Sequence, residues 1–150
     1  MHNMSERVHI MPKPYIEYRS GYKYQLASDY SIKISIKPKK DIDTKFIKLD
    51  TKGNLTIIDG YAWDGPSGPV IDRKENMRAS LVHDALYQLM RHRKLTAKAH
   101  KDKADKIFKK ICIEDGISKK TAAIYYYGLK IGGKPAADPK NKKDIQKAPE

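Results

Sequence analysis

A helical stretch that is apolar over most of its circumference constrains this chain more than any other feature. Between residues 76 and 91, apolar side chains recur every three or four residues and cover two adjoining faces. These residues are Met77, Ala79, Leu81, Val82, Ala85, Leu86, Leu89 and Met90. A helix with so much apolar surface must be buried against other elements, so the rest of the chain has to pack against more than one of its sides.

The remaining stripe of this helix is polar and carries the strongest chemical signal of the sequence. It contains Ser80, His83, Asp84, Tyr87 and Arg91. Burying a carboxylate is costly unless it is paired, hydrogen-bonded or bound to a metal. Adjacent helical residues point about 100° apart, so His83 and Asp84 can serve one site only at the seam between two packing surfaces. We therefore expect their partners to come from other segments of the chain.

The other segments divide into a strand-rich part and a helical part. Residues 30–36 alternate strictly, and residues 46–49 and 55–58 flank a Gly-containing turn that is typical of a hairpin. Two more helices are predicted, at 96–116 with Thr96 as N-cap and from 118 to the glycine pair at 132–133. The expected fold class is α+β, with a small antiparallel sheet of about four strands followed by three packed helices.

The sheet and the helices are joined by a segment rich in glycine and proline. Residues 59–75 include the only tryptophan, Trp63, and their composition favours a tightly built loop without regular structure. The chain has 150 residues, which is the length of one domain. We expect a flexible N-terminus at 1–14, a single domain at 15–133 and a disordered basic tail at 134–150.

Several classes of protein are excluded by composition. The only cysteine is Cys112, so neither an intrachain disulfide nor a cysteine-rich zinc site can form. No apolar run approaches the roughly 20 residues of a transmembrane helix. The first fourteen residues lack the apolar core of a secretory signal, which predicts cytoplasmic synthesis with a reduced thiol.

The positive charge is concentrated in the last sixty residues. The chain has 31 basic and 18 acidic residues and a formal net charge of +13. Residues 1–90 hold 14 basic and 11 acidic residues, so residues 91–150 hold 17 and 7 and carry +10 of the charge. Such a field favours an anionic partner, which is nucleic acid, phospholipid headgroups or an anionic envelope polymer, with a solvated lysine-rich surface as the alternative. The anion-binding candidates are Lys101, Lys106, Lys109 and Lys110.

Two arrangements can satisfy the polar stripe. In the first, His83 and Asp84 bind a divalent metal together with carboxylates from other segments, of which Asp64, Asp72 and Asp105 are the candidates. In the second, the same groups form a structural network in which Asp84 pairs with Arg78 or Arg91. Ser67 is a further candidate, as a nucleophile with His83 as its base, although the sequence lacks a Gly-x-Ser-x-Gly elbow.

Four segments together resemble a known family. They are residues 24–30, 60–69, 78–87 and 104–108, and across residues 22–133 they match the small phage and prophage family catalogued as domain of unknown function 1353. Its motif residues in this sequence are Asp64, Ser67, Pro69, Arg78, His83, Asp84, Tyr87, Asp105 and Phe108. The chain departs from the usual pattern at Gly65 and Pro66 and in charged insertions at 37–45 and 94–103.

The resemblance implies a phage or prophage origin among late genes for lysis or virion assembly. It places the protein in the host cytoplasm or in association with the virion, and it adds a phage protein to the expected anionic partners. It also strengthens the case for a shared site, because the motif residues come from separate segments and converge on a buried helix. Arg78, Tyr87 and Trp63 would support that site.

Two function hypotheses follow from the sequence. The first is a small metal-dependent hydrolase that acts on a polyanionic substrate during late infection or lysis. Its metal ligands would be Asp64, His83, Asp84 and Asp105, with His83, Asp84 and Ser67 as the catalytic candidates. The second is a non-catalytic phage protein that serves in virion assembly or binds nucleic acid or the envelope. Its His-Asp cluster would be a structural polar network.

Overall fold

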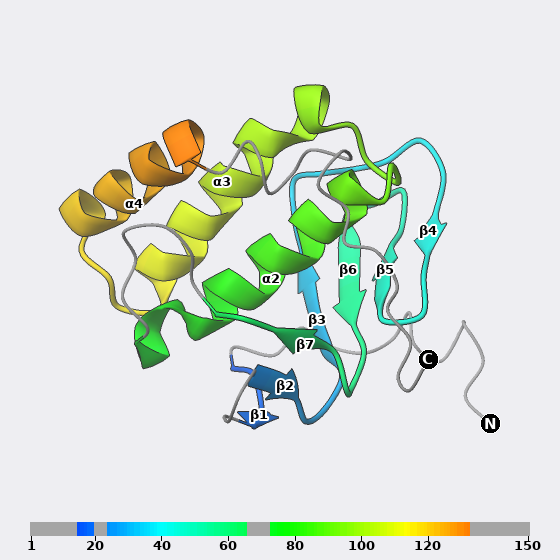
Figure 1. Ribbon diagram of the computed structural model, residues 1–150, viewed down its shortest axis with the longest axis horizontal. Coiled ribbons are helices and arrows are strands. Elements are labelled where there is room, and N and C mark those ends of the chain that lie inside the picture. Colours follow the sequence, from blue (N-terminus) through cyan, green and yellow to red (C-terminus); the bar gives the residue numbers. More distant parts are fainter. Residues whose placement is uncertain (1–14, 20–23, 66–72, 133–150) are drawn as a thin grey trace, which may run out of the picture.

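The computed structural model describes residues 15–19, 24–65 and 73–132, so the terminal predictions for 1–14 and 134–150 lie outside the described residues. Within these residues the chain forms two small antiparallel sheets followed by three helices (Figure 1). One sheet has the order β3-β6-β5-β4, with β3 (Tyr30–Lys33), β4 (Ile42–Asp43), β5 (Ile47–Leu49) and β6 (Asn54–Ile57). The other has the order β1-β2-β7, with β1 (Tyr18–Arg19), β2 (Tyr24–Leu26) and β7 (Ala62–Trp63). The α+β class expected from the sequence is confirmed.

The predicted hairpin is formed by β5 and β6, and the carboxylate of Asp50 makes several hydrogen bonds within its turn. Asp50 accepts hydrogen bonds from the backbone amides of Lys52 and Asn54, both at 2.9 Å, and from the Asn54 side chain. These bonds hold the pKa of Asp50 below its ordinary value, although its partial burial acts in the opposite direction. Gly53 has a φ of +89°, a conformation that favours glycine. The turn therefore follows from local sequence chemistry.

Replacing Gly53 with alanine is expected to destabilise the fold by about 2–3 kcal/mol, because two costs combine at this position. The left-handed backbone disfavours a Cβ atom, and the added carbon would lie 2.3 Å from the carbonyl oxygen of Ile34. Gly132→Ala is the control, since a Cβ there meets nothing within 4 Å. Urea unfolding should leave Gly132→Ala within about 0.5 kcal/mol of the wild type. Equal stability of the two variants would contradict this account of the turn.

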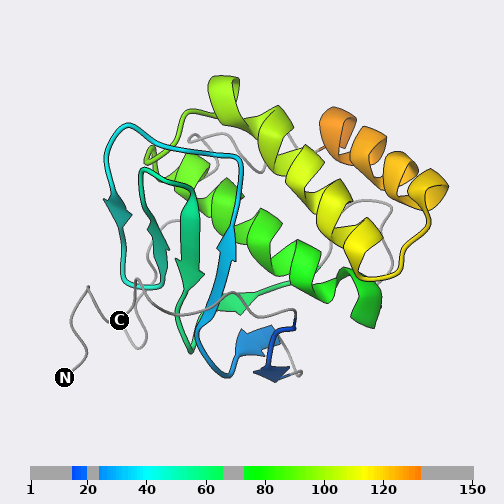
Figure 2. The same cartoon turned by 180° about the vertical axis from the view of Figure 1, so that it is seen from behind.

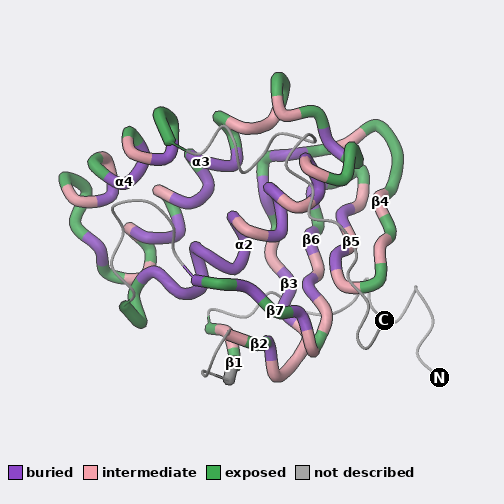
Figure 3. The backbone as a smooth tube through the Cα atoms, viewed as in Figure 1, coloured by how far each residue is buried: buried purple, intermediate pink, exposed green. Residues whose placement is uncertain are grey.

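Three helices follow the strands, and the first of them lies across one face of the four-stranded sheet (Figures 1 and 2). They are α2 (Lys74–Arg91), α3 (Ala97–Glu114) and α4 (Lys119–Gly132). α2 crosses the sheet, α3 lies beside it, and α4 is the outermost helix. Most residues of α2 are buried, as its apolar circumference predicts, and Figure 3 shows this burial along nearly its whole length. Sheet and α2 together therefore form the centre of the core.

Helix ends follow the predicted signals closely. Thr96 is the N-cap residue of α3, and Gly116 follows its C-cap with a φ of +109°. α2 begins at Lys74, two residues before the predicted start, and the Asn76 side chain accepts a hydrogen bond from the Arg73 amide at 3.1 Å.

None of the helices in the described part of the chain is long and apolar enough to cross a membrane.

The glycine- and proline-rich segment is more regular at its start than the sequence predicts. Ala62 and Trp63 form β7, which pairs with β2 through Tyr24 opposite Trp63. Only residues 59–65 and 73–75 of the predicted loop are described. β4 was likewise not expected. Both strands have two residues, which is too short for an alternating pattern to be visible in the sequence.

Candidate functional site

A buried carboxylate lies at the centre of the polar stripe. Asp105 on α3 is completely buried and accepts three side-chain hydrogen bonds. His83 Nε2 lies 2.7 Å from its Oδ1, Tyr87 Oη donates to the same oxygen at 2.5 Å, and Lys101 Nζ donates to Oδ2 at 2.8 Å. The convergence of His83, Tyr87 and Asp105 that the motif implies is therefore present at the α2–α3 seam.

The charge states of this cluster follow from its geometry. Burial alone would raise the pKa of Asp105, but hydrogen bonds from His83, Lys101 and Tyr87 outweigh it and hold the pKa below its ordinary value. Burial lowers the pKa of His83 more than the Asp105 carboxylate raises it, and the positive charge of Lys101 lowers it further. The cluster therefore contains an ionised Asp105, a charged Lys101 and a neutral His83 at pH 7.

The tautomer of His83 is then determined. An ionised carboxylate can only accept hydrogen bonds, so the proton of the neutral imidazole must be on Nε2. Nδ1 consequently carries the lone pair of the neutral ring. Every buried polar side-chain atom of the described residues has a partner. Because the Nε2 proton is bound to Asp105, Nδ1 is the ring atom of His83 that can accept a proton.

Two aromatic rings and a third helix fix the dyad of His83 and Asp105. The Tyr87 ring lies 4.0 Å from the His83 ring, centroid to centroid, and the Phe108 ring lies 5.3 Å from it. Lys101 Nζ also donates to the carbonyl oxygen of Leu129 at 3.1 Å, which ties α4 to the cluster. The imidazole is thus held between rigid helices, which is the support that a precisely oriented functional group requires.

The predicted metal quartet does not come together. Asp64 is exposed and Asp84 is half-buried. Burial raises the pKa of Tyr61, and both of these carboxylates raise it further, so they lie on the Tyr61 side of α2. Among the described residues there is no group of three or more His, Cys, Asp or Glu side chains that could hold a metal ion. The divalent metal role of His83, Asp84, Asp64 and Asp105 thus gains no support from this geometry.

Trp63, which the sequence places beside the site, contacts α2 through the side chain of Ser80. Its Nε1 donates to Ser80 Oγ at 3.0 Å, and Ser80 Oγ donates to the Met77 carbonyl oxygen at 2.8 Å. Trp63 also packs against Tyr24 of the neighbouring strand, with ring centroids 5.7 Å apart. The hydrogen bond from Trp63 to Ser80 holds β7 against α2 about one turn before His83.

Arg78, the third predicted supporting residue, forms a separate buried network. Its guanidinium donates two hydrogen bonds to Asp115, one to Glu114 and one to the Tyr30 hydroxyl, all at 2.9 Å. The structural hypothesis paired Asp84 with Arg78 or Arg91. The hydrogen bonds of Arg78 go instead to Asp115, Glu114 and Tyr30. No local sequence pattern indicates these partners, because they lie 36, 37 and 48 residues away from Arg78.

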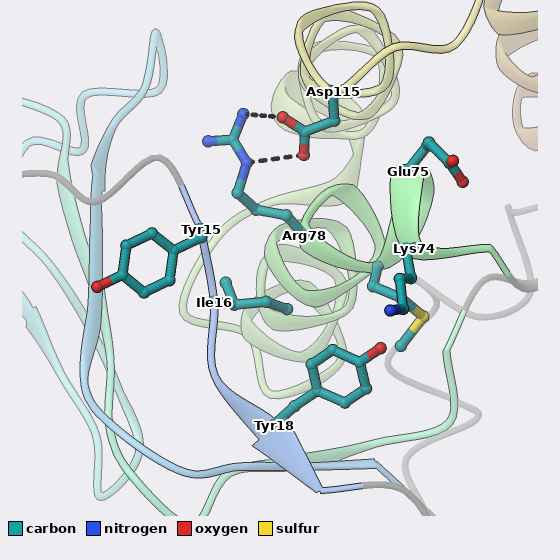
Figure 4. A pocket seen from close by; sticks show the side chains of 8 residues that line it. Tyr15, Ile16, Tyr18, Lys74, Glu75, Arg78 and Asp115 are labelled. Atoms are coloured by element: carbon teal, nitrogen blue, oxygen red, sulfur yellow. Dashed lines mark hydrogen bonds and ion pairs between the residues drawn. The ribbon is translucent and has the colours of Figure 1, made fainter.

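Two cavities border the Arg78 network. One, of about 530 Å³, is lined by Tyr15, Ile16, Tyr18 and the start of α2, and Figure 4 shows the paired Arg78 and Asp115 at its edge. The other, of about 800 Å³, lies between β3 and α3. Neither cavity is lined by His83 or Asp105. Arg78 therefore acts as a strut between the sheet and the end of α3, and it does not belong to the His83 cluster.

The four predicted anion-binding lysines have different surroundings. Lys101 points inward to Asp105 and has an internal structural role, which its i, i+4 spacing from Asp105 could have indicated. Lys106 pairs with Asp102 at 3.0 Å on the surface. Lys109 lies 5.8 Å from the Tyr126 ring centroid, and Lys110 lines the larger cavity. These positions do not form one dedicated anion site.

Three candidate residues of the glycine- and proline-rich segment are not described by the structure. Ser67, Pro69 and Asp72 lie outside the described residues. Cys112 is completely buried, and burial together with Asp115 raises the pKa of its thiol to about 12. It is therefore a core residue, as expected, and would remain a thiol at neutral pH.

The comparison with known proteins agrees with the motif. No curated protein and no solved structure matches the chain. A family model described as "Protein of unknown function (DUF1353)" matches residues 42–129, which include Trp63, His83, Tyr87 and Asp105 and leave out the first resembling segment at 24–30. Since the match covers more than half of the sequence, the chain belongs to the DUF1353 family.

Proposed function

We propose that this protein is a hydrolase of carboxylic esters in which His83 activates a water molecule. One observation carries the proposal: His83 Nε2 lies 2.7 Å from the buried carboxylate of Asp105, which also accepts hydrogen bonds from Tyr87 and Lys101. A neutral imidazole that is oriented by a carboxylate can act as a general base. Both groups lie on α2 and α3, so their geometry is set before a substrate arrives.

The reaction follows from that arrangement. His83 Nδ1 takes a proton from water while the water oxygen attacks the ester carbonyl carbon. The imidazolium formed is stabilised by Asp105, and it returns the proton to the alkoxide oxygen as the carbon–oxygen bond breaks. Carboxylic acid and alcohol leave, and His83 is neutral again. Asp105, Tyr87 and Lys101 are positioning residues in this scheme, because they act only through His83.

The proposal is tested with p-nitrophenyl esters of increasing acyl length and with a phosphodiester for comparison. His83→Gln should lower the ester rate by a factor of about 10²–10⁴. His100→Gln is the matched control, because His100 lies near the start of α3, where its Nδ1 is 3.0 Å from the carbonyl oxygen of Thr96. Equal rates in the wild type and His83→Gln would contradict the proposal. Parallel assays in EDTA and in calcium, magnesium or zinc test the separate metal prediction for Asp64 and Asp84.

A second candidate is favoured by the low exposure of the cluster. The His83 side chain is only 3 % exposed, and the network joins α2, α3 and α4. Under this hypothesis the cluster is a structural lock in a non-catalytic phage protein, which serves assembly or binds an anionic partner. Wild-type protein that hydrolyses no ester, together with a large loss of stability in His83→Gln, would favour the lock. The phage origin, the late-infection role and the host or virion location remain part of this proposal.

A further inference from the structure

The outward face of α4 carries most of the exposed apolar surface that the structure describes. Ile124, Tyr127 and Ile131 are 57, 60 and 84 % exposed, and Tyr15 at 55 % is the remaining large hydrophobic residue of this kind among the described residues. Their spacing of three and four places Ile124, Tyr127 and Ile131 on one side of the helix. The opposite side, with Ala122, Tyr125, Tyr126 and Leu129, is buried. α4 thus has a second apolar face that is exposed among the described residues, and Figure 3 marks buried and exposed positions along the helix.

The same face is bordered by positive charge. Lys119 and Lys120 lie in the first turn of α4, Lys130 lies in the last, and all three are exposed. The helix contains no Asp or Glu, so nothing within it neutralises these lysines. α4 is the outermost helix of the fold, and its apolar stripe therefore faces away from the sheet (Figures 1 and 2).

An apolar stripe with an aromatic residue and flanking lysines matches the surface of an anionic bilayer. Isoleucine side chains enter the boundary of the acyl chains, tyrosine is suited to the headgroup level, and lysines attract anionic headgroups. Nucleic acid would use the lysines but gains little from exposed isoleucines. Docking of a second copy would place two lysine-bordered faces against each other. Each chain has a net charge of +13, so electrostatic repulsion disfavours this dimer.

We propose that this α4 face, formed by Lys119, Lys120, Ile124, Tyr127, Lys130 and Ile131, docks on an anionic lipid bilayer. α4 would lie in the plane of the interface with its apolar stripe inserted at a shallow depth. The proposal goes beyond ester hydrolysis and does not depend on it, because a protein with an inactive His83 would still carry this face.

The test is flotation of the full chain with two kinds of vesicle, one of phosphatidylcholine and the other also containing phosphatidylglycerol. The wild type should float with the anionic vesicles, and its binding should weaken as salt is added. The Ile124→Ser/Ile131→Ser double variant should bind them at least about tenfold more weakly. It keeps every lysine, so the loss would come from the apolar stripe. Tyr15→Ser is the control, because it removes an equally exposed apolar side chain that lies outside α4, and it should bind like the wild type.

Three results would overturn the proposal. One is equal binding of the wild type and the double variant to anionic vesicles. Another is equal binding of the wild type to both kinds of vesicle. The third is a dimer in sedimentation velocity that the double substitution dissociates, without vesicle binding by the wild type, which would assign the face to a second copy. Circular dichroism should show the same helix content and melting curve for all variants, because every substituted side chain is exposed.

Discussion

Asp105→Ala is expected to lower the free energy of unfolding by about 3–5 kcal/mol, because it removes the one acceptor shared by three buried donors. His83 Nε2, Tyr87 Oη and Lys101 Nζ would all lose their common partner in the interior. The ammonium of Lys101 is the most costly of these, since its side chain is only 15 % exposed. Chemical denaturation at pH 7 measures the effect.

Asp102→Ala provides the matched control on the same helix. Asp102 lies one turn earlier, pairs with Lys106 and Tyr126, and its side chain is 52 % exposed. An exposed ion pair contributes little, so this variant should lose less than about 1 kcal/mol. Asp105→Asn should fall between the two, because it keeps the shape of the carboxylate and loses its charge. Similar losses for Asp105→Ala and Asp102→Ala would show that the buried cluster does not stabilise the helix packing as described.

Arg78→Met is expected to cost about 2–4 kcal/mol of unfolding free energy. Methionine fills part of the arginine volume, so the loss comes mainly from the broken bonds to Asp115, Glu114 and Tyr30. These bonds join β3 to the end of α3. Burial raises the pKa of Tyr30, so its hydroxyl keeps its proton in the variant and loses a partner.

Arg91→Met is the control, because Arg91 also lies on α2 but is half-buried and ends the helix. The free energy of unfolding of Arg91→Met should be less than about 1 kcal/mol below that of the wild type. Arg78→Lys should recover only part of the stability, since lysine cannot form the two parallel bonds that arginine makes to Asp115. A wild-type-like denaturation curve for Arg78→Met would contradict the strut assigned to this residue.

The elements with a long periodic pattern could be predicted from the sequence. The apolar circumference of α2 required burial, and the periodicity with its end signals at Thr96 and Gly116 defined α3 within two residues. β4 and β7 could not be predicted, because strands of two residues are defined by their pairing and not by their own pattern. Tertiary contact, here between Trp63 and Tyr24, determines such short elements.

The candidate site could be predicted only in part. The family motif included His83, Tyr87 and Asp105, and these three do meet. The cost of a buried carboxylate was argued for Asp84, which is only half-buried, whereas the completely buried carboxylate is Asp105. Asp84 was grouped with His83 because the two are adjacent, yet adjacent helical residues diverge by about 100° and Asp84 lies toward Tyr61. The partners of Arg78 were not predictable, since no local pattern connects residues that far apart along the chain.

The protonation state of His83 tests the central claim most directly. Long-range ¹H–¹⁵N spectra of the ¹⁵N-labelled protein, with His83 assigned by its loss in His83→Gln, report the tautomer and the pKa of this ring. We expect a neutral imidazole with its proton on Nε2 at pH 7, and protonation only below the ordinary pKa of 6.5. An imidazolium at pH 7, or a neutral ring with its proton on Nδ1, would contradict the proposed base and the arrangement with Asp105 from which it is inferred.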